Sequence, residues 1–237
     1  MAAPSSSAAG PSPADQQPQA PPDLVGAVTE YVKAYMAQYD GSHDFNHIRR
    51  VVALATHILE RLPPPAAAGA AAPDRQVVVL AALLHDVGDK KYLRAGEDGT
   101  TQVRDVLLAR GADPALAETV QAVCAGVSFS GEKRDPARVR ALLAAHPELA
   151  VVQDADRLDA IGAVGIGRVF TFSGARSGGS MEDSVRHFHD KLLRVGDMMK
   201  TDVGREMAEE RTRRMRTFLS WWEEEERLAL SPDTSPP

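Results

Sequence analysis

The sequence predicts an all-α protein built as one compact helical bundle. Apolar residues recur at intervals of three and four along most of the chain, and few segments show the two-residue alternation of a β-strand. The 237 residues are enough for one full-sized domain and few for two. A hydrophobic content of 43% with 25% charged residues is ordinary for a globular protein, so we expect the helices to enclose a single core.

The N-terminal part of the chain is expected to contain a tail, two helices and a linker. Residues 1–22 are mostly alanine, serine, proline and glutamine, with almost nothing to bury, which predicts a disordered tail. Helical periodicity then runs over 24–39 and over 46–62, where Pro63 stops the second run. The proline- and alanine-rich stretch 63–73 is expected to be an exposed linker.

The central part of the chain contains its most apolar segment. The stretch VVVLAALLHDV within 74–87 is apolar almost all round, which predicts a buried central helix that ends at Gly88. Weaker helical periodicity follows at 100–110, 114–126 and 136–145.

The C-terminal third is predicted to hold three longer helices. They are expected over the ranges 147–172, 181–198 and 202–229. Loops at 127–135 and 173–180 are rich in glycine, serine, lysine and arginine, a composition suited to surface segments that contact a ligand. We therefore expect one domain over 23–230 and a frayed end at 231–237.

Charge and cysteine content exclude several classes of protein. The net charge of −6, without an extensive block of lysine or arginine, argues against a nucleic-acid partner but permits a small phosphorylated substrate. Cys124 is the only cysteine, so the chain has no internal disulfide and no thiolate metal cluster, and we expect this side chain to be buried. No apolar run approaches the length of a membrane span, and residues 1–22 lack the features of a secretory signal. We expect a cytoplasmic location, with the nucleus as an alternative, and no membrane partner.

Three short strings place histidine or aspartate beside strongly apolar helical sequence. They are SHDFNHIRRV at 42–51, LLHDVGD at 83–89 and DADRLD at 154–159. Burying such polar groups is costly unless something pairs with them. A divalent metal would do so, because two imidazoles and two carboxylates are a suitable ligand set. If the strings converge in the fold, they indicate a metal-dependent hydrolase.

Helical spacing places several of these groups on apolar faces. His47 shares a face with Val51 and Leu54, where a lone histidine is more often a satisfied core residue than a ligand. His85 also points inward, and Asp86 beside it is more telling, because aspartate is almost never fully buried without a partner. Asp86 lies in the last turn of its helix, where the negative end of the helix dipole favours a cation.

The third string leaves two aspartates as candidates. Asp154 and Asp156 both continue apolar rows of the same predicted helix, which is apolar on both sides. Helical phase therefore does not choose between them. Either carboxylate could be a buried ligand, and either could be satisfied by a neighbouring arginine such as Arg157.

The last predicted helix carries a mixed-charge surface and two tryptophans. The basic run at 211–216 is flanked by acidic residues, and pairs such as Glu210–Arg214 indicate a solvated, salt-bridged helix rather than a nuclear localisation signal. Trp221 and Trp222 are expected to anchor this helix, with one ring inward and the other at a rim or subunit contact. A homodimer is compatible with this arrangement.

The order of the strings resembles the H…HD…D signature of the HD-domain metal-dependent phosphohydrolases. Six blocks occur in the expected order: HDFNHIRRV, LLHDVGDKKY, VSFSGEK, VVQDADRLDAIGAVGIGR, HFHDKLL and AEERTRRM. Together they are similar to the compact stand-alone branch that includes the YpgQ-type nucleotide pyrophosphohydrolases. The resemblance extends from about residue 24 to about residue 226, and implies a helical HD-domain fold.

The resemblance implies one divalent metal with four protein ligands. By position, His47, His85, Asp86 and Asp156 match these ligands, which favours Asp156 over Asp154. Mixed nitrogen and oxygen ligation suits Mn²⁺ best, with Fe²⁺, Co²⁺, Ni²⁺, Zn²⁺ or Mg²⁺ as alternatives. The metal would activate the attacking water, so Asp86 contributes to catalysis through the ion that it holds.

Other positions are implied to lie near the substrate. His43 and Asp44 precede the first ligand, where the family places residues near the substrate or behind the ligands. Asp89 corresponds to an acidic position that could orient or deprotonate the attacking water. The candidate phosphate contacts are Lys90, Lys91, Lys191 and Arg211.

The implied reaction is the hydrolysis of a nucleoside triphosphate to a monophosphate and pyrophosphate. A phosphomonoesterase or phosphodiesterase of the same superfamily, or a non-catalytic sensor that binds metal and nucleotide, are the alternatives. Relatives with two metals use additional histidines between the HD pair and the last aspartate. Here only His146 lies in that interval, which favours one metal.

Overall fold

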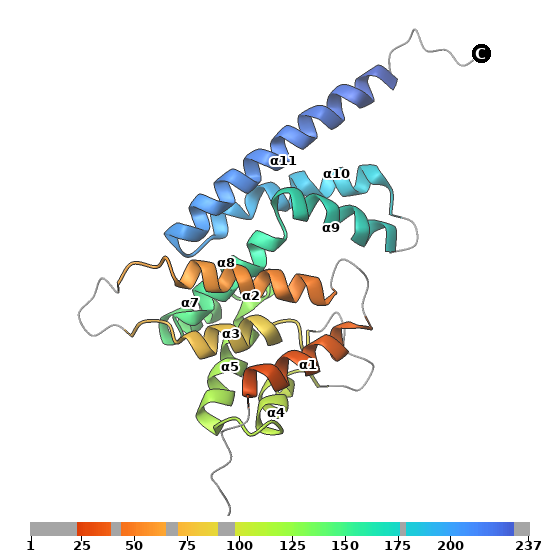
Figure 1. The fold of residues 1–237 in the computed structure, drawn as a ribbon. Helices are drawn as coiled ribbons and strands as arrows, with labels where there is room; N and C mark the ends of the chain where they lie inside the picture. The colour runs from red at the N-terminus through yellow and green to blue at the C-terminus, as the bar shows by residue number, and fades with distance from the viewer. Residues whose placement is uncertain (1–22, 39–43, 65–70, 90–97, 176–178, 230–237) are drawn as a thin grey trace, which may run out of the picture.

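The protein is helical throughout the part of the chain that is described. A computed structural model describes residues 23–38, 44–64, 71–89, 98–175 and 179–229. These residues form eleven α-helices and two short 3₁₀-helices without a strand (Figure 1), so the predicted all-α fold is confirmed. The predicted tails at 1–22 and 231–237, and most of the predicted linker, lie outside the described residues.

The first seven helices form the lower body of the molecule in Figure 1 together with α8. Their bounds are α1 (Leu24–Met36), α2 (Phe45–Leu59), α3 (Arg75–Leu84), α4 (Gln102–Leu108), α5 (Pro114–Val127), α6 (Phe129–Arg134) and α7 (Pro136–Ala145). The C-terminal elements are α8 (Glu148–Asp159), α9 (Gly162–Ala175), α10 (Met181–Asp190), η1 (Leu192–Arg194), η2 (Gly196–Met198) and α11 (Asp202–Ala229).

Aspartate side chains begin several of the helices. The Asp44 carboxylate accepts hydrogen bonds from the backbone N–H groups of Asn46 and His47, and Asp74 and Asp113 cap α3 and α5 in the same way. Such a cap satisfies backbone donors that the first turn leaves without helical partners. The cap of α2 is thereby fixed three residues before His47.

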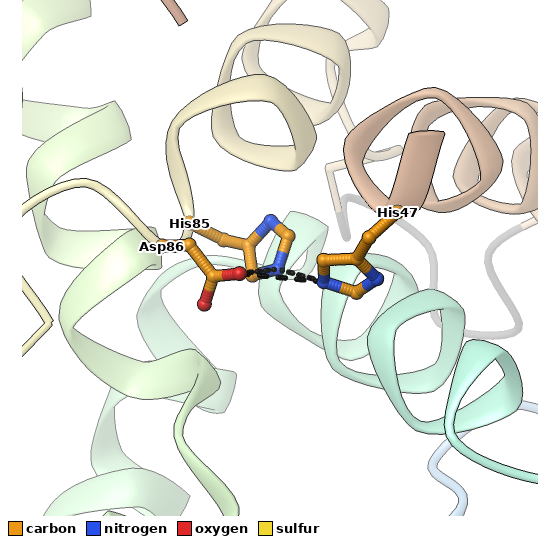
Figure 2. A group of neighbouring side chains, drawn as sticks. All are labelled: His47, His85 and Asp86. Atoms are coloured by element: carbon orange, nitrogen blue, oxygen red, sulfur yellow. Dashed lines mark hydrogen bonds and ion pairs between the residues drawn. The ribbon is translucent and has the colours of Figure 1, made fainter. Parts of the chain in front are cut away.

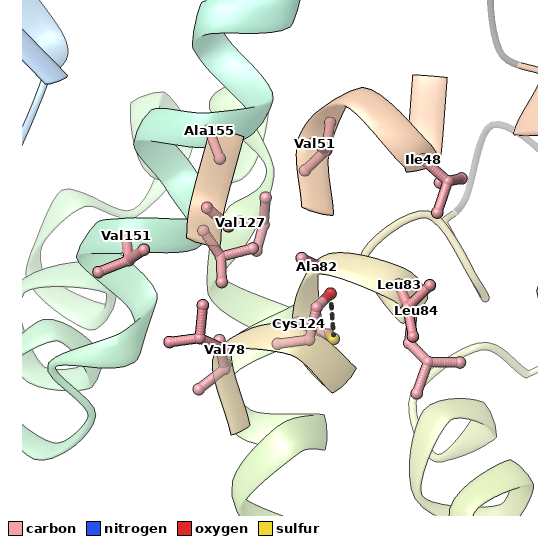
Figure 3. Close-up of a cluster of buried hydrophobic side chains, with 14 of the residues drawn as sticks. Ile48, Val51, Val78, Ala82, Leu83, Leu84, Cys124, Val127, Val151 and Ala155 are labelled. Atoms are coloured by element: carbon pink, nitrogen blue, oxygen red, sulfur yellow. Dashed lines mark hydrogen bonds between the residues drawn. The ribbon is translucent and has the colours of Figure 1, made fainter. Parts of the chain in front are cut away.

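Helices α2, α3 and α8 pack against one another and form the centre of the core, with α5 against α3 and α8. The beginning of α2 and the end of α3 lie beside each other, as Figure 2 shows. Val78, Leu80 and Leu84 of α3 have no exposed surface, which confirms that the predicted central helix is buried. The helix ends at Leu84 rather than at Gly88, and residues 85–88 form a turn. Figure 3 shows this core, where the buried Cys124 thiol donates to the Ala81 carbonyl oxygen at 3.6 Å.

The prediction of one helix over 147–172 is wrong. The chain breaks between α8 and α9, where Gly162 adopts a φ of +77°. Only glycine enters this left-handed region without a steric penalty. A Cβ atom at Gly162 would also lie 3.0 Å from Cγ of Arg211 on α11. The break therefore ends α8 at Asp159 and lets α9 continue in a new direction.

Two further segments differ from the prediction. The loop expected at 127–135 contains the short helix α6, because the Ser128 hydroxyl accepts from the Gly131 backbone N–H and caps it. The helix expected over 181–198 ends at Asp190 and continues as the two 3₁₀-helices. Short helical turns thus occur in one segment predicted as a loop and in one predicted as a continuous helix.

Helices α9, α10 and α11 form the upper part of the molecule in Figure 1, where α11 lies across α8 and α9. Phe170, Phe188, Phe218 and Trp222 make ring contacts with one another and hold these three helices together. Trp221 is 60% exposed, so one of the two tryptophans faces inward and the other outward, as expected. Among the described residues, no helix combines the length and apolar character needed to cross a membrane.

Candidate metal centre

Three helices bring the polar strings together at one buried point. His47 lies in the first turn of α2, His85 is the C-cap residue directly after α3, and Asp86 follows it. Asp156 comes from α8. His47 is 1% exposed, and His85 and Asp86 are each 7% exposed. Figure 2 shows the two imidazoles and the Asp86 carboxylate pointing toward one another.

The atoms that face one another are all possible metal ligands. Nε2 of His47 lies 3.2 Å from Nε2 of His85 and 3.3 Å from Oδ2 of Asp86, which is 3.5 Å from Nε2 of His85. Oδ1 of Asp156 lies 3.7 Å from Nε2 of each histidine. Ligands about 2.1 Å from one metal are roughly 3.0–3.4 Å apart, so the first three atoms lie close to the spacing of a coordination sphere. The Asp156 side chain is 29% exposed and lies on the solvent side.

The hydrogen bonds behind the imidazoles decide which ring nitrogen faces the centre. Nδ1 of His85 lies 2.9 Å from the Ala82 carbonyl oxygen, which can only accept, so Nδ1 carries the proton. Nδ1 of His47 lies 2.8 Å from Oδ2 of Asp159 and donates to this carboxylate. In the neutral form of each ring, which is the form that binds a metal, Nε2 therefore presents a lone pair toward the other ring and toward Asp86. Such a set of converging acceptors fits a divalent cation.

Electrostatics also favour positive charge at this point. Burial of the ring lowers the pKa of His47, but the carboxylates of Asp159 and Asp86 outweigh this effect and raise it to about 9. Burial raises the pKa of Asp159, but hydrogen bonds from His47 and Arg50 outweigh it and hold this pKa well below its usual range. Positive charge on the His47 ring is therefore favoured at neutral pH, and a metal ion bound at Nε2 would supply it in place of the proton.

The structure distinguishes Asp154 from Asp156, because the two carboxylates have different partners. Asp154 is completely buried and accepts from the backbone N–H groups of Lys200 and Thr201 and from the Thr201 hydroxyl, each at 2.8 Å. Its carboxylate therefore holds the start of α11. Asp156, two residues later on α8, faces the two histidines instead.

Asp44 and Asp89 lie close in sequence to the proposed ligands. Besides capping α2, Asp44 accepts from the Asn46 side-chain amide at 2.7 Å and borders a surface cavity of about 440 Å³. The other described residues around this cavity are Asn46, Arg49, Arg50 and Ala53. Asp89 is half-buried in the turn after Asp86, and its backbone N–H donates to the Asp86 carbonyl oxygen at 3.4 Å.

The candidate phosphate contacts have different surroundings. Nζ of Lys191 lies 4.8 Å from the ring centre of Phe129, a cation–π contact at the edge of α6. Arg211 is half-buried, donates to the Leu158 carbonyl oxygen and packs against Gly162. The remaining three predicted substrate residues, His43, Lys90 and Lys91, lie outside the described residues.

The sequence did not predict a role for three residues that support the centre: Asp159, Arg50 and Arg168. Asp159 accepts from His47, from Arg50 of α2 and from Arg168 of α9. Asp159 ends the third string and Arg50 belongs to the first, so both stood within the recognised motifs. The signal that could have found Asp159 is its spacing from Asp156. Residues three apart lie on the same face of a helix, so this spacing places Asp159 on the face of α8 that carries Asp156.

Comparisons with known proteins identify the family. A model of the HD domain matches residues 44–161. The uncharacterized protein YpgQ of Bacillus subtilis is 37% identical over 198 residues, which cover 81% of this chain and 88% of that protein. The crystal structure of Bacillus subtilis YpgQ in complex with ADP is similar with a TM-score of 0.65 and 34% identity, covering 85% of this chain and 94% of that chain. An HD-superfamily hydrolase from Bacillus thuringiensis has a TM-score of 0.61 and 29% identity, with coverages of 85% and 95%.

The chain therefore belongs to the HD-domain family and has the fold of an HD-superfamily hydrolase. The resemblance to this family and to its YpgQ branch, predicted from the six sequence blocks, is confirmed. The matched segment begins at the cap of α2 and ends just after α8. It thus includes the four residues that converge at the candidate metal centre.

Proposed function

We propose that this protein is a metal-dependent phosphohydrolase that converts nucleoside triphosphates to monophosphates and pyrophosphate. The observation that carries the proposal is the convergence of His47, His85, Asp86 and Asp156. Its similarity to Bacillus subtilis YpgQ, whose structure contains ADP, supports a nucleotide as the substrate.

In this proposal, the four side chains hold one divalent ion. When bound, such an ion lowers the pKa of a coordinated water and neutralises charge on phosphoryl oxygens. The protein contributes two imidazole nitrogens, whose orientation is set by hydrogen bonds from Nδ1, and two carboxylates that balance the charge of the ion. Mixed nitrogen and oxygen ligands favour Mn²⁺, with Fe²⁺, Co²⁺, Ni²⁺ or Zn²⁺ as alternatives and Mg²⁺ as the weakest candidate.

The proposed reaction also needs a group that handles the proton of the water. Asp89 is our candidate, because its carboxylate follows the ligand pair by only three residues. Lys191 and Arg211 are proposed phosphate contacts, and Arg49 and Arg50 add positive charge at the cavity beside Asp44. A cytoplasmic location and a homodimer remain predictions.

A nucleotide panel tests the proposal. Protein loaded with Mn²⁺ is incubated with the common ribo- and deoxyribonucleoside triphosphates, and products are separated by ion-exchange chromatography. We expect monophosphate and pyrophosphate in equal amounts. Release of inorganic phosphate with a nucleoside diphosphate would instead indicate cleavage of the terminal anhydride bond, and release of inorganic phosphate from added nucleoside monophosphates would indicate a phosphomonoesterase. Tight nucleotide binding without turnover would indicate a sensor. Protein with Asp86→Ala is the control for contaminating activity.

A further inference from the structure

Asp159 is a buried carboxylate that lies directly behind the proposed ligand His47. Asp159 is the last residue of α8, one turn after Asp156, and its side chain is 1% exposed. Oδ2 of Asp159 lies 2.8 Å from Nδ1 of His47, on the side of the ring opposite Nε2. The contact therefore leaves Nε2, the proposed ligand atom of His47, available to a metal.

Two arginines complete the surroundings of this carboxylate. Nε of Arg50 lies 2.6 Å from Oδ1 and its Nη2 lies 3.1 Å from Oδ2, which makes a bidentate pair. Nη1 of Arg168 lies 2.9 Å from Oδ2. All of these neighbours are donors, so Asp159 accepts every hydrogen bond and its position is fixed by α2 and α9.

We propose that Asp159 is a positioning residue for the metal centre, which holds His47 as the Nδ1–H form with Nε2 toward the ion. The inference rests on the proposed metal site. A carboxylate behind a ligating histidine fixes the orientation of the ring and makes the opposite nitrogen a better ligand. One helix, α8, thus supplies a ligand in Asp156 and the support of another ligand in Asp159.

An asparagine in this place would reverse the hydrogen bond. The two arginines need an acceptor, so they would attract the single amide oxygen of Asp159→Asn and turn its NH₂ group toward His47. An NH₂ group can only donate, which favours a proton on Nε2 instead of Nδ1. A lone pair would then be lost where the metal is expected to bind.

The structure offers a matched control in Asp154. This aspartate lies on the same helix and is also completely buried, but its partners are Lys200 and Thr201 rather than a ligand. Asp154→Asn should therefore lower the melting temperature without altering the metal centre. Asp159→Glu, which keeps the charge but moves it, should recover part of the loss caused by Asp159→Asn.

Two readouts test the proposal, and neither is activity. The first is the Nδ1–H resonance of His47 in metal-free protein by ¹⁵N-edited NMR, which we expect to exchange slowly in the wild type and in Asp154→Asn and to disappear in Asp159→Asn. The second is Mn²⁺ affinity by titration calorimetry, which we expect to fall about 10- to 100-fold in Asp159→Asn and to change less than about twofold in Asp154→Asn.

The outcomes separate this inference from the proposed function. Equal Mn²⁺ affinity in the wild type and in folded Asp159→Asn would overturn the role of Asp159 alone. If Asp159→Asn does not fold, an Nδ1 of wild-type His47 that carries no protected proton would overturn it as well. A wild-type protein that keeps this protected Nδ1–H but binds no Mn²⁺ would refute the metal site itself.

Discussion

Nδ1 of His47 and Nδ1 of His85 each form a hydrogen bond to another group of the protein. Nε2 of each ring therefore faces Asp86. The acceptors are a carboxylate in one case and a backbone carbonyl in the other. Because both acceptors belong to packed helices, the rings are oriented before any ion arrives. Such preorganisation reduces the cost of binding the ion.

Replacing Asp86 by alanine should remove the metal without unfolding the chain. The variant loses one of two carboxylates that balance the charge of the ion, so we expect Mn²⁺ binding to weaken more than about 100-fold. Titration calorimetry measures the affinity, and circular dichroism checks the fold. Asp105→Asn, which changes an exposed carboxylate on α4, is the control. Unchanged Mn²⁺ affinity in Asp86→Ala would contradict the assigned ligand.

The sequence alone could identify part of this centre. His47, His85 and Asp86 stand in strings where polar groups interrupt apolar helical faces, and that conflict marks them. Helical phase could not separate Asp154 from Asp156, because α8 is buried on both sides. The role of Asp159 depends on Arg50, which is 109 residues away in the chain, so only the tertiary structure reveals it.

The boundary between α8 and α9 is the feature of the fold that a periodic pattern could not predict. Apolar residues continue at helical spacing through Gly162, and glycine is compatible with a helix interior at a modest cost. The positive φ at this position is what separates the two helices. The break places Arg168 of α9 where it can reach Asp159 at the end of α8.

Gly162→Ala should destabilise the protein, whereas Gly167→Ala should not. Alanine at Gly162 would be forced into the left-handed region and against Arg211, so we expect a loss of about 2 kcal/mol in the free energy of unfolding. Gly167 lies inside α9, and a Cβ atom there would meet no atom within 4 Å, so alanine should stabilise by about 0.5–1 kcal/mol. Urea unfolding measures both, and equal effects would refute the assigned break.

Helix α6 is tied to α8 and to the start of α11 by Glu132. Its carboxylate accepts from Nζ of Lys200 at 2.6 Å and from Arg157, which is 3% exposed. Burial raises the pKa of Glu132, but the hydrogen bonds from Lys200 and Arg157 outweigh it and hold this pKa below 4.5. The sequence did not predict this network, because Glu132 lies in 127–135, a segment whose composition is typical of a loop.

Glu132→Gln should therefore destabilise the protein in a pH-dependent way. A carboxyl with a lowered pKa stabilises the fold fully above its unfolded value of 4.5, and this contribution is lost as the pH falls below that value. At pH 7 we expect a loss of about 3 kcal/mol, because Arg157 stays buried without its carboxylate. The difference from the wild type should shrink in urea titrations at decreasing pH.

A matched glutamate serves as the control for this pH series. Glu118 is 62% exposed and lies 3.4 Å from Arg104, so Glu118→Gln should change stability by less than about 0.5 kcal/mol. A Glu132→Gln penalty of the same size at every pH would show that its charge is not the source of the stabilisation.

The molecule as a whole joins two parts around the candidate centre. Helices α2, α3 and α8 enclose the ligands, while α9, α10 and α11 form the upper part and supply Arg168 and Arg211 near it. Periodicity and composition predicted this all-α class, because helical spacing depends only on local sequence. Which helices meet at the centre depends on packing between distant segments, and only the family resemblance anticipated it.

Metal-dependent hydrolysis by this site is tested by pyrophosphate release from a nucleoside triphosphate before chelation, after chelation and during stepwise return of Mn²⁺. We predict that chelation abolishes the release and that about one Mn²⁺ per chain restores it. Release that continues unchanged in the chelated protein, or that no added divalent ion supports, would contradict the account.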